Sequence, residues 1–346
     1  MNVLIVNSVT PFVRRGAEEL ADHLCEQLNA THLVRAEVLR IPFSWEPFEE
    51  LPEQIFVHCA LQLPNVDRVI ALRFPAYLVP HPTRIIWLTG QCRRLDDLCG
   101  PGESDLLQMT RESRLREMIR LAESEAFSKC RRIFTASKAN QERLKHYTGF
   151  DAEVLMPPLK NPELFADRGD GGYLFAGGRI NVNNRQHLLV EALARTVSCP
   201  RLIVAGAPDT PEDANRLRET VRRLRLEDRV VLDFGLHAVT SIADYVNHAK
   251  ACAYMPVGED SVGYVAMEAA AASKPVITAR DSGSTLRLVL NGETGCVTEP
   301  DAEDIARIID FLVAKPARCR EMGRAARCLW DSFQATWPAT IDRLLS

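Results

Sequence analysis

The sequence predicts an α/β protein of two domains, each built on a parallel sheet. Short apolar runs alternate with amphipathic helical segments along most of the chain, which is the pattern of parallel α/β folds. The 346 residues exceed what one core of ordinary size needs. A segment rich in chain-breaking residues, from Pro157 to Gly172, lies near the middle. We therefore expect a first domain at residues 1–158 and a second at residues 159–329.

The first domain opens with a strand, a loop and a helix. Residues 3–6 are a short apolar run, and residues 17–28 place Leu20, Leu24 and Leu28 on one helical face. The same alternation predicts further strands at residues 34–39, 68–72, 84–88, 131–135 and 153–156, and helices at residues 112–127 and 138–147.

The second domain repeats the alternation after the breaker-rich segment. Its expected strands are residues 173–176, 202–205, 230–234, 252–255 and 275–278. Its expected helices are residues 185–197, 211–224 and 242–249, followed by one that begins near Tyr264. Residues 329–345 also have helical character, with a break expected near Pro338.

The composition is that of an ordinary globular protein. Hydrophobic residues make up 46% and charged residues 25%, and the net charge of −4 gives no basis for nucleic-acid binding. The ten cysteines are scattered and form no Cys-x-x-Cys motif, which indicates a reducing compartment. The first residues lack the pattern of a signal peptide, and no apolar run reaches the length of a membrane span. We expect a cytoplasmic protein.

The stretch from Gly258 to Pro300 carries most of the functional argument. Asp260 and Glu268 stand eight positions apart with Gly263 between them, and an alanine-rich helical segment follows. A chain that turns at Gly263 and enters a helix near Tyr264 offers its first free N–H groups, around Val265, as an anion site. Two carboxylates beside such amides suit a ligand that is part phosphate and part polyol. A sugar nucleotide is a ligand of this kind.

A second candidate segment follows the first strand of the second domain. Gly178 and Arg179 come directly after this strand, and Arg185 opens the next helix. Ligands of doubly wound sheets bind at such strand-to-helix loops. Two cations there could hold a diphosphate and stabilise the charge that grows on it when a bond to it breaks. The alternative is that both arginines are ordinary surface residues at a helix start.

The order of these motifs resembles the retaining glycosyltransferases of family 4. That family carries Glu-x7-Glu, an alanine-rich helix, a Lys-Pro-Val-Ile strand, a glycine-containing loop and Asn/Asp-Gly-x-Thr-Gly. The resemblance covers nearly the whole chain and is strongest after Tyr173. The matching residues are Asp260-x7-Glu268, Lys274-Pro275-Val276-Ile277, Asp281-Ser282-Gly283 and Asn291-Gly292-Glu293-Thr294-Gly295.

The resemblance implies a GT-B fold, in which two Rossmann-like domains face each other across a cleft. The N-terminal domain would bind the acceptor, the C-terminal domain would bind the nucleotide-sugar donor, and a C-terminal helix at residues 330–346 would cross back to the first domain. The implied activity is sugar transfer with retention from a UDP- or GDP-linked donor to a hydroxyl of a glycan or glycolipid precursor, in polysaccharide biosynthesis and without a metal. The resemblance does not decide whether the protein contacts the inner face of the cell membrane peripherally. It does not decide the oligomeric state either.

The resemblance also suggests a role for each site residue. Glu268 would bind the ribose, and Asp260 or the adjacent Glu259 the donor sugar. Arg179 and Arg185 would neutralise the diphosphate. The remaining expected donor contacts are backbone groups and the loop after the first strand, namely Arg15, Gly16, Gly178, Gly263, Tyr264, Val265 and Gly283.

Several positions depart from the family pattern around the expected site. Arg185 replaces the usual lysine and Asp260 the usual glutamate, and the other departures are Arg15, Gly90, Ser284 and Arg287. These changes keep a second interpretation open, in which the chain is a catalytically weakened nucleotide-binding subunit. A phosphorylase or a nucleotide-sugar epimerase of the same fold is a further alternative.

Overall fold

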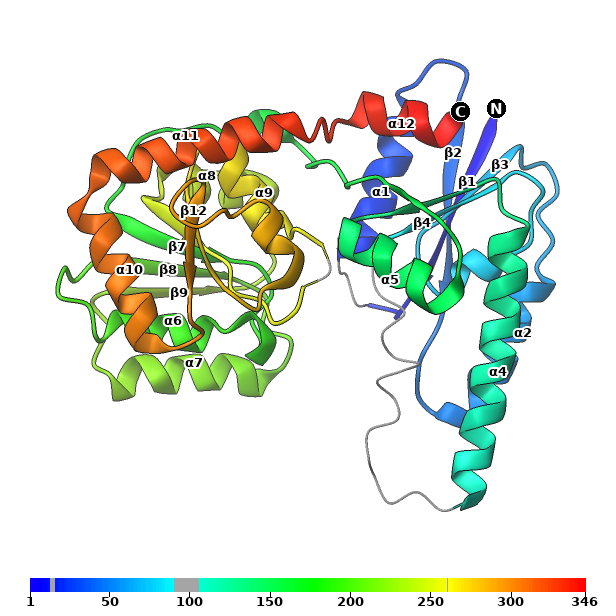
Figure 1. Ribbon diagram of the computed structural model, residues 1–346, viewed down its shortest axis with the longest axis horizontal. Coiled ribbons are helices and arrows are strands. Elements are labelled where there is room, and N and C mark those ends of the chain that lie inside the picture. Colours follow the sequence, from blue (N-terminus) through cyan, green and yellow to red (C-terminus); the bar gives the residue numbers. More distant parts are fainter. Residues whose placement is uncertain (13–15, 90–105, 260) are drawn as a thin grey trace. The chain divides into compact units, whose positions relative to one another are not determined.

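The computed structural model describes residues 1–12, 16–89, 106–259 and 261–346, and divides them into two compact units. The first unit comprises residues 1–160 and 336–346, and the second comprises residues 161–335. Each unit is a six-stranded parallel sheet with helices on both faces (Figure 1). The α/β prediction is therefore confirmed for both halves of the chain.

The first unit has the strand order β2-β1-β3-β4-β5-β6. Its elements match the expected alternation, with one helix, α2, that the sequence pattern did not predict. The strands are β1 (Asn2–Val9), β2 (Arg35–Pro42), β3 (Arg68–Ala71), β4 (Arg84–Leu88), β5 (Arg132–Thr135) and β6 (Glu153–Val154). The helices are α1 (Gly16–Asn29), α2 (Leu51–Ala60), α4 (Leu106–Ser128), α5 (Lys138–Thr148) and α12 (Trp337–Leu345).

Alternating side chains of the first sheet enter two separate cores. Val69 and Ala71 of β3 lie in the core covered by α2 and α4. Ile70 and Leu72 point the other way, into the core covered by α1 and α12. This period of two explains why the central strands consist of continuous apolar residues, since both faces of the sheet are buried.

The last helix packs on the first unit. Trp337, Ile341 and Leu344 are buried in the core beside α1, and the indole N–H of Trp337 donates to the carbonyl oxygen of Leu159 at 2.9 Å. The predicted return of the C-terminal helix to the first domain is confirmed. The break expected near Pro338 is confirmed, because the preceding helix ends at Ser332 and α12 starts at Trp337. Pro338 lies in the first turn of α12, where the missing N–H costs nothing.

The second unit has the strand order β12-β11-β10-β7-β8-β9. The sequence pattern did not predict its last strand or the helix that follows that strand, β12 and α10, and it identified only the end of α11. The strands are β7 (Tyr173–Gly177), β8 (Arg201–Gly206), β9 (Val230–Phe234), β10 (Ala251–Ala253), β11 (Val276–Ala279) and β12 (Gly295–Thr298). The helices are α6 (Gln186–Leu193), α7 (Pro211–Arg223), α8 (Val239–His248), α9 (Tyr264–Ala271), α10 (Ala302–Ala314) and α11 (Pro316–Ser332).

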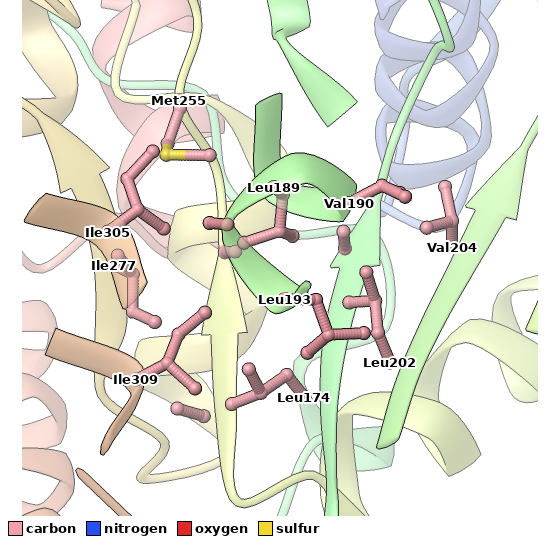
Figure 2. Packing of buried hydrophobic residues seen from close by; sticks show 14 of the residues in the cluster. Leu174, Leu189, Val190, Leu193, Leu202, Val204, Met255, Ile277, Ile305 and Ile309 are labelled. Atoms are coloured by element: carbon pink, nitrogen blue, oxygen red, sulfur yellow. The ribbon is translucent and has the colours of Figure 1, made fainter. Parts of the chain in front are cut away.

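One core fixes the strands of the second unit against α6 and α10. Leu174 of β7 and Ile277 of β11 pack with Leu189 of α6 and Ile309 of α10, and all four are fully or almost fully buried (Figure 2). Each such side chain contributes roughly 1.5–3 kcal/mol when it is removed from water. This packing gives the loops at the carboxyl ends of the strands a rigid base.

The chain order reverses beside β7, at the centre of the second sheet. From β7 the chain continues outward through β8 and β9, and it then returns to place β10 on the opposite side of β7. Doubly wound sheets bind ligands outside the carboxyl ends of the strands at such a reversal. The loops that follow β7 and β10 are therefore the natural place to look for a site.

Candidate functional site

The loops after β7 and β10 contact each other at the carboxyl ends of these two strands, where the strand order reverses. The first loop runs from Gly178 to Arg185, and the second from Tyr254 to Gly263. The amide of Val257 in the second loop donates to the carbonyl oxygen of Asn183 in the first at 2.9 Å. Two segments that are some 70 positions apart in the sequence are thus held together by their backbones.

Arg185 joins this arrangement to a third loop, which follows β11. Its Nη1 and Nη2 atoms donate to the two carboxylate oxygens of Asp281 at 2.7 and 2.5 Å, and its side chain is only 13% exposed. The carbonyl oxygen of Asp281 accepts from the amide of Gly258 at 2.7 Å. The hydrogen bonds from Arg185 lower the pKa of the Asp281 carboxyl below its usual range, so the pair is ionised at neutral pH.

Arg185 also sits in an unusual backbone conformation. It caps α6 with φ +56° and ψ +29°, in the left-handed region that side chains other than glycine seldom adopt. Helix α6 starts at Gln186, one residue later than the sequence pattern predicted. The backbone conformation fixes the Cα end of the Arg185 side chain, and the ion pair with Asp281 fixes its guanidinium end.

Arg179 is anchored differently and is more exposed. Its Nη1 atom donates to the Oδ2 atom of Asp209 at 3.0 Å, and the side-chain amide of Asn181 donates to the same oxygen at 2.9 Å. About half of the Arg179 side chain is open to solvent. An exposed pair of this kind contributes little to stability, so Arg179 can exchange Asp209 for a stronger anion at small cost.

The backbone of Gly178 lies in close contact with Val265 and Gly206. Its φ is +94°, and an added Cβ would lie 3.2 Å from the Cγ2 atom of Val265 at the start of α9. A Cβ on Gly206, at the end of β8, would lie 1.9 Å from the carbonyl oxygen of Gly178. These contacts leave room only for glycine at Gly206 and hold the first loop close to the start of α9.

Gly263 forms the turn into α9. It has φ +83°, and an added Cβ would lie 2.3 Å from the ring of Tyr254. Helix α9 begins at Tyr264, where the sequence placed it, and the amide of Met267 makes the first bond of its ladder, to Gly263. The amides before Met267 have no acceptor within the helix and carry the positive end of its dipole.

Glu259 lies in the second loop with its carboxylate held from two sides. The hydroxyl of Ser261 donates to Oε1 at 3.2 Å, and that of Tyr254 donates to Oε2 at 3.4 Å. Burial, and then the nearby charge of Glu259, raise the pKa of the Tyr254 phenol, which stays protonated as a donor. The carbonyl oxygen of Glu259 accepts a hydrogen bond from the amide of Ser284 at 2.7 Å. A Cβ added to Gly283 would lie 2.2 Å from the same carbonyl oxygen.

Glu268 lies about one turn inside α9 and is half buried. Its charge is close enough to add to the effect of burial, the larger cause, in raising the pKa of the Cys252 thiol in β10. Glu268 therefore lies within electrostatic range of β10, the strand that pairs with β7.

The remaining expected site residues lie elsewhere. Asp260, Arg15 and Gly90 fall outside the described residues. Gly16 is the exposed first residue of α1 in the first unit. The roles assigned to all these residues, and to Arg179, Arg185, Glu259, Glu268, Gly178, Gly263, Tyr264, Val265 and Gly283, stay predictions.

Sequence reasoning missed the partners of the two arginines. It did not single out Asp209, and it treated Asp281 only as part of a loop. Both aspartates come shortly after a strand, β8 and β11 respectively, and an acidic residue at the carboxyl end of a parallel strand is a signal that could have found them.

Among the described residues, no group of three or more His, Cys, Asp or Glu side chains is placed to hold a metal ion. Within the same ranges, no helix is both long and apolar enough to cross a membrane.

Comparison with known proteins supports a family for the second half of the chain. Residues 164–328 match the family model described as Glycosyl transferases group 1. A D-inositol 3-phosphate glycosyltransferase of Gordonia bronchialis is 32% identical over 179 residues, which cover 49% of this chain and 38% of that protein. The chain thus spans less than half the length of this curated relative.

Solved structures resemble the whole chain in fold. Sucrose-phosphate synthase from Thermosynechococcus elongatus matches with a TM-score of 0.73 and 18% identity, over 99% of this chain and 97% of that one. Anabaena HepE, solved in complexes with UDP and with UDP-glucose, matches with a TM-score of 0.72 and 16% identity in its UDP complex, over 100% and 98% of the two chains.

The comparisons support one fold for the whole chain and one family match for its second unit. The two parallel six-stranded sheets with their helices match GT-B neighbours over nearly the full chain. Within this two-domain α/β fold, the second unit is the part that carries the similarity to glycosyl transferases group 1.

Proposed function

We propose that the chain is a retaining glycosyltransferase of family 4 that moves a sugar from a nucleoside diphosphate donor to a hydroxyl acceptor. The observation that carries this proposal is the meeting of the loops after β7, β10 and β11. They bring two arginines, the half-buried Glu259 and the start of α9 to the reversal in strand order. These groups match a ligand with a diphosphate at its centre and hydroxyls at both ends.

The diphosphate is the leaving group, and its stabilisation is the main chemical task. As the bond between the sugar and the phosphate breaks, negative charge grows on the phosphate oxygens. Arg185 and the first amides of α9 would offset this charge with little reorganisation, since the fold already holds them, and Arg179 would join them by exchanging Asp209 for the phosphate. In this mechanism the departing phosphate takes the proton of the acceptor hydroxyl, and no metal is needed.

The carboxylates would fix the two ends of the donor. Glu268 would accept hydrogen bonds from the ribose hydroxyls, and Asp260 or Glu259 from hydroxyls of the transferred sugar. The hydrogen bonds from Tyr254 and Ser261 hold the Glu259 carboxylate in one place. Binding energy at both ends would orient the bond that breaks.

The relatives indicate which donors to test first. HepE was solved with UDP and UDP-glucose, and the Gordonia relative is a glycosyltransferase by name. The acceptor of this chain would be a glycan or glycolipid precursor, in polysaccharide biosynthesis.

Calorimetric titration with UDP, GDP, ADP and CMP tests the proposed donor site without knowledge of the acceptor. We expect one nucleoside diphosphate to bind with or without magnesium. Glu268→Ala should weaken that binding about 10- to 100-fold, because it removes hydrogen bonds between a charged group and the ribose. Glu219→Ala, on the exposed side of α7, is the matched control and should bind as the wild type does. Equal affinity of Glu268→Ala and the wild type would contradict the role of Glu268.

A further inference from the structure

The ion pair between Arg185 and Asp281 poses a question for any diphosphate site. A cation expected to bind phosphate already has a carboxylate partner, with both of its Nη atoms engaged. Asp281 must therefore either compete with the diphosphate or hold the guanidinium for it. The geometry of the pair distinguishes these two possibilities.

The guanidinium keeps unused donors. Arginine has five N–H donors, and an end-on pair with one carboxylate uses one hydrogen on each Nη atom. Three N–H groups of Arg185 thus remain, among them the Nε edge, and they have no hydrogen-bond partner in the described part of the chain. A second anion can bind these donors while Asp281 stays in place.

Asp281 is itself held by its backbone. Its carbonyl oxygen accepts from Gly258, and the adjacent Ser282 is fully buried with its hydroxyl bonded to the amide of Ala279. The carboxylate therefore projects from a fixed loop, and Arg185 reaches it from a fixed position at the start of α6. A competitor that a ligand must displace would not need to be anchored in this way.

We propose that Asp281 is a positioning residue for donor binding. It holds Arg185 by one edge of the guanidinium and presents the remaining N–H donors to the diphosphate of the nucleotide sugar. This inference rests on the proposed function, because it takes Arg185 as a ligand of the diphosphate. Without Asp281, the long side chain would have to lose its rotamer freedom when the donor binds, and the affinity would fall.

The test compares the nucleoside diphosphate with its nucleoside, so that only the phosphate contacts are measured. Calorimetry would give the affinities of wild type, Asp281→Ala and Arg185→Ala for UDP and uridine, or for GDP and guanosine if the wild type prefers GDP. We expect Asp281→Ala to lose roughly tenfold in affinity for the diphosphate and to bind the nucleoside unchanged. In the Arg185→Ala background, the same substitution should have no further effect.

Two further variants guard against a general effect on the fold. Asp281→Asn keeps the shape of the side chain, cannot accept from both Nη atoms, and should also lose affinity for the diphosphate alone. Asp331→Ala breaks an exposed ion pair with Arg327 on α11 and should leave both affinities unchanged.

The outcomes separate this inference from the proposed function. Unchanged or tighter diphosphate binding by Asp281→Ala and Asp281→Asn would overturn the positioning role and show that Asp281 competes with the donor. Equal losses for nucleoside and diphosphate would overturn it as well, since they indicate a structural role. Wild-type protein that binds no nucleoside diphosphate would overturn the donor site itself.

Discussion

Arg185→Ala is expected to lower the turnover of the nucleotide sugar about 10²- to 10³-fold, because it removes a fixed cation from the developing charge of the leaving group. The donor affinity should fall less, since the guanidinium contributes most when the diphosphate carries its full charge. Release of nucleoside diphosphate from the donor, measured under saturating conditions, gives the turnover directly.

The same substitution should change stability little. The Asp281 side chain is 42% exposed, so the ion pair contributes at most about 1 kcal/mol at neutral pH. The pair lowers the folded-state pKa of Asp281 below the ordinary value of 3.8, so its contribution is present above that value and disappears as the pH falls through the acid range. The difference in the free energy of unfolding between wild type and Arg185→Ala should therefore vanish at low pH.

Arg223→Ala is the control for Arg185→Ala. It removes an arginine whose partner is Glu191 at 3.4 Å, in an exposed pair between α7 and α6. It should leave turnover and stability close to those of the wild type. Normal turnover of Arg185→Ala would contradict the assignment of Arg185 to the diphosphate.

Gly206→Ala is expected to reduce the free energy of unfolding by about 3 kcal/mol and to weaken donor binding with it. The residue has φ +152°, and an added Cβ would lie 1.9 Å from the carbonyl oxygen of Gly178. The neighbour is backbone, so it cannot rotate away, and either β8 or the loop before Arg179 must shift. Chemical denaturation gives the loss of stability, and nucleotide titration gives the effect on the loop.

Gly235→Ala separates the steric effect from the backbone strain. Gly235 has a similar φ of +150°, but an added Cβ there would meet no atom within 4 Å. Its substitution should cost only the strain of the conformation, about 1 kcal/mol, and should leave nucleotide binding intact. Equal effects of the two substitutions would show that the contact between Gly206 and Gly178 does not shape the site.

Most of the fold could be predicted because local patterns determine it. The central strands are continuous apolar runs, buried on both faces, and their spacing specifies parallel α/β units. The turn at Gly263 and the start of α9 at Tyr264 also follow from local chemistry, because a glycine, which tolerates positive φ, precedes a run of strong helix formers from Ala266 to Ala271.

The rest depends on contacts that no local pattern reveals. Arg185 and Asp281 are 96 positions apart in sequence, and only the pairing of β7, β10 and β11 brings them together. By contrast, the break near Pro338 follows from local chemistry, since α11 ends at Ser332, α12 starts at Trp337, and Pro338 is tolerated only in the first turn of a helix.

Consumption of a nucleotide sugar by the purified chain is the most direct test of the proposed function. UDP-glucose and a panel of other UDP- and GDP-sugars would be incubated with glycan and glycolipid acceptors in the presence of EDTA, and the anomeric configuration of any product would be determined by NMR. We expect transfer from one donor with retained configuration and without a metal. An inverted product, or turnover that requires a metal, would contradict the proposed mechanism. Diphosphate binding with no transfer to any acceptor would contradict the proposed activity and support a nucleotide-binding subunit.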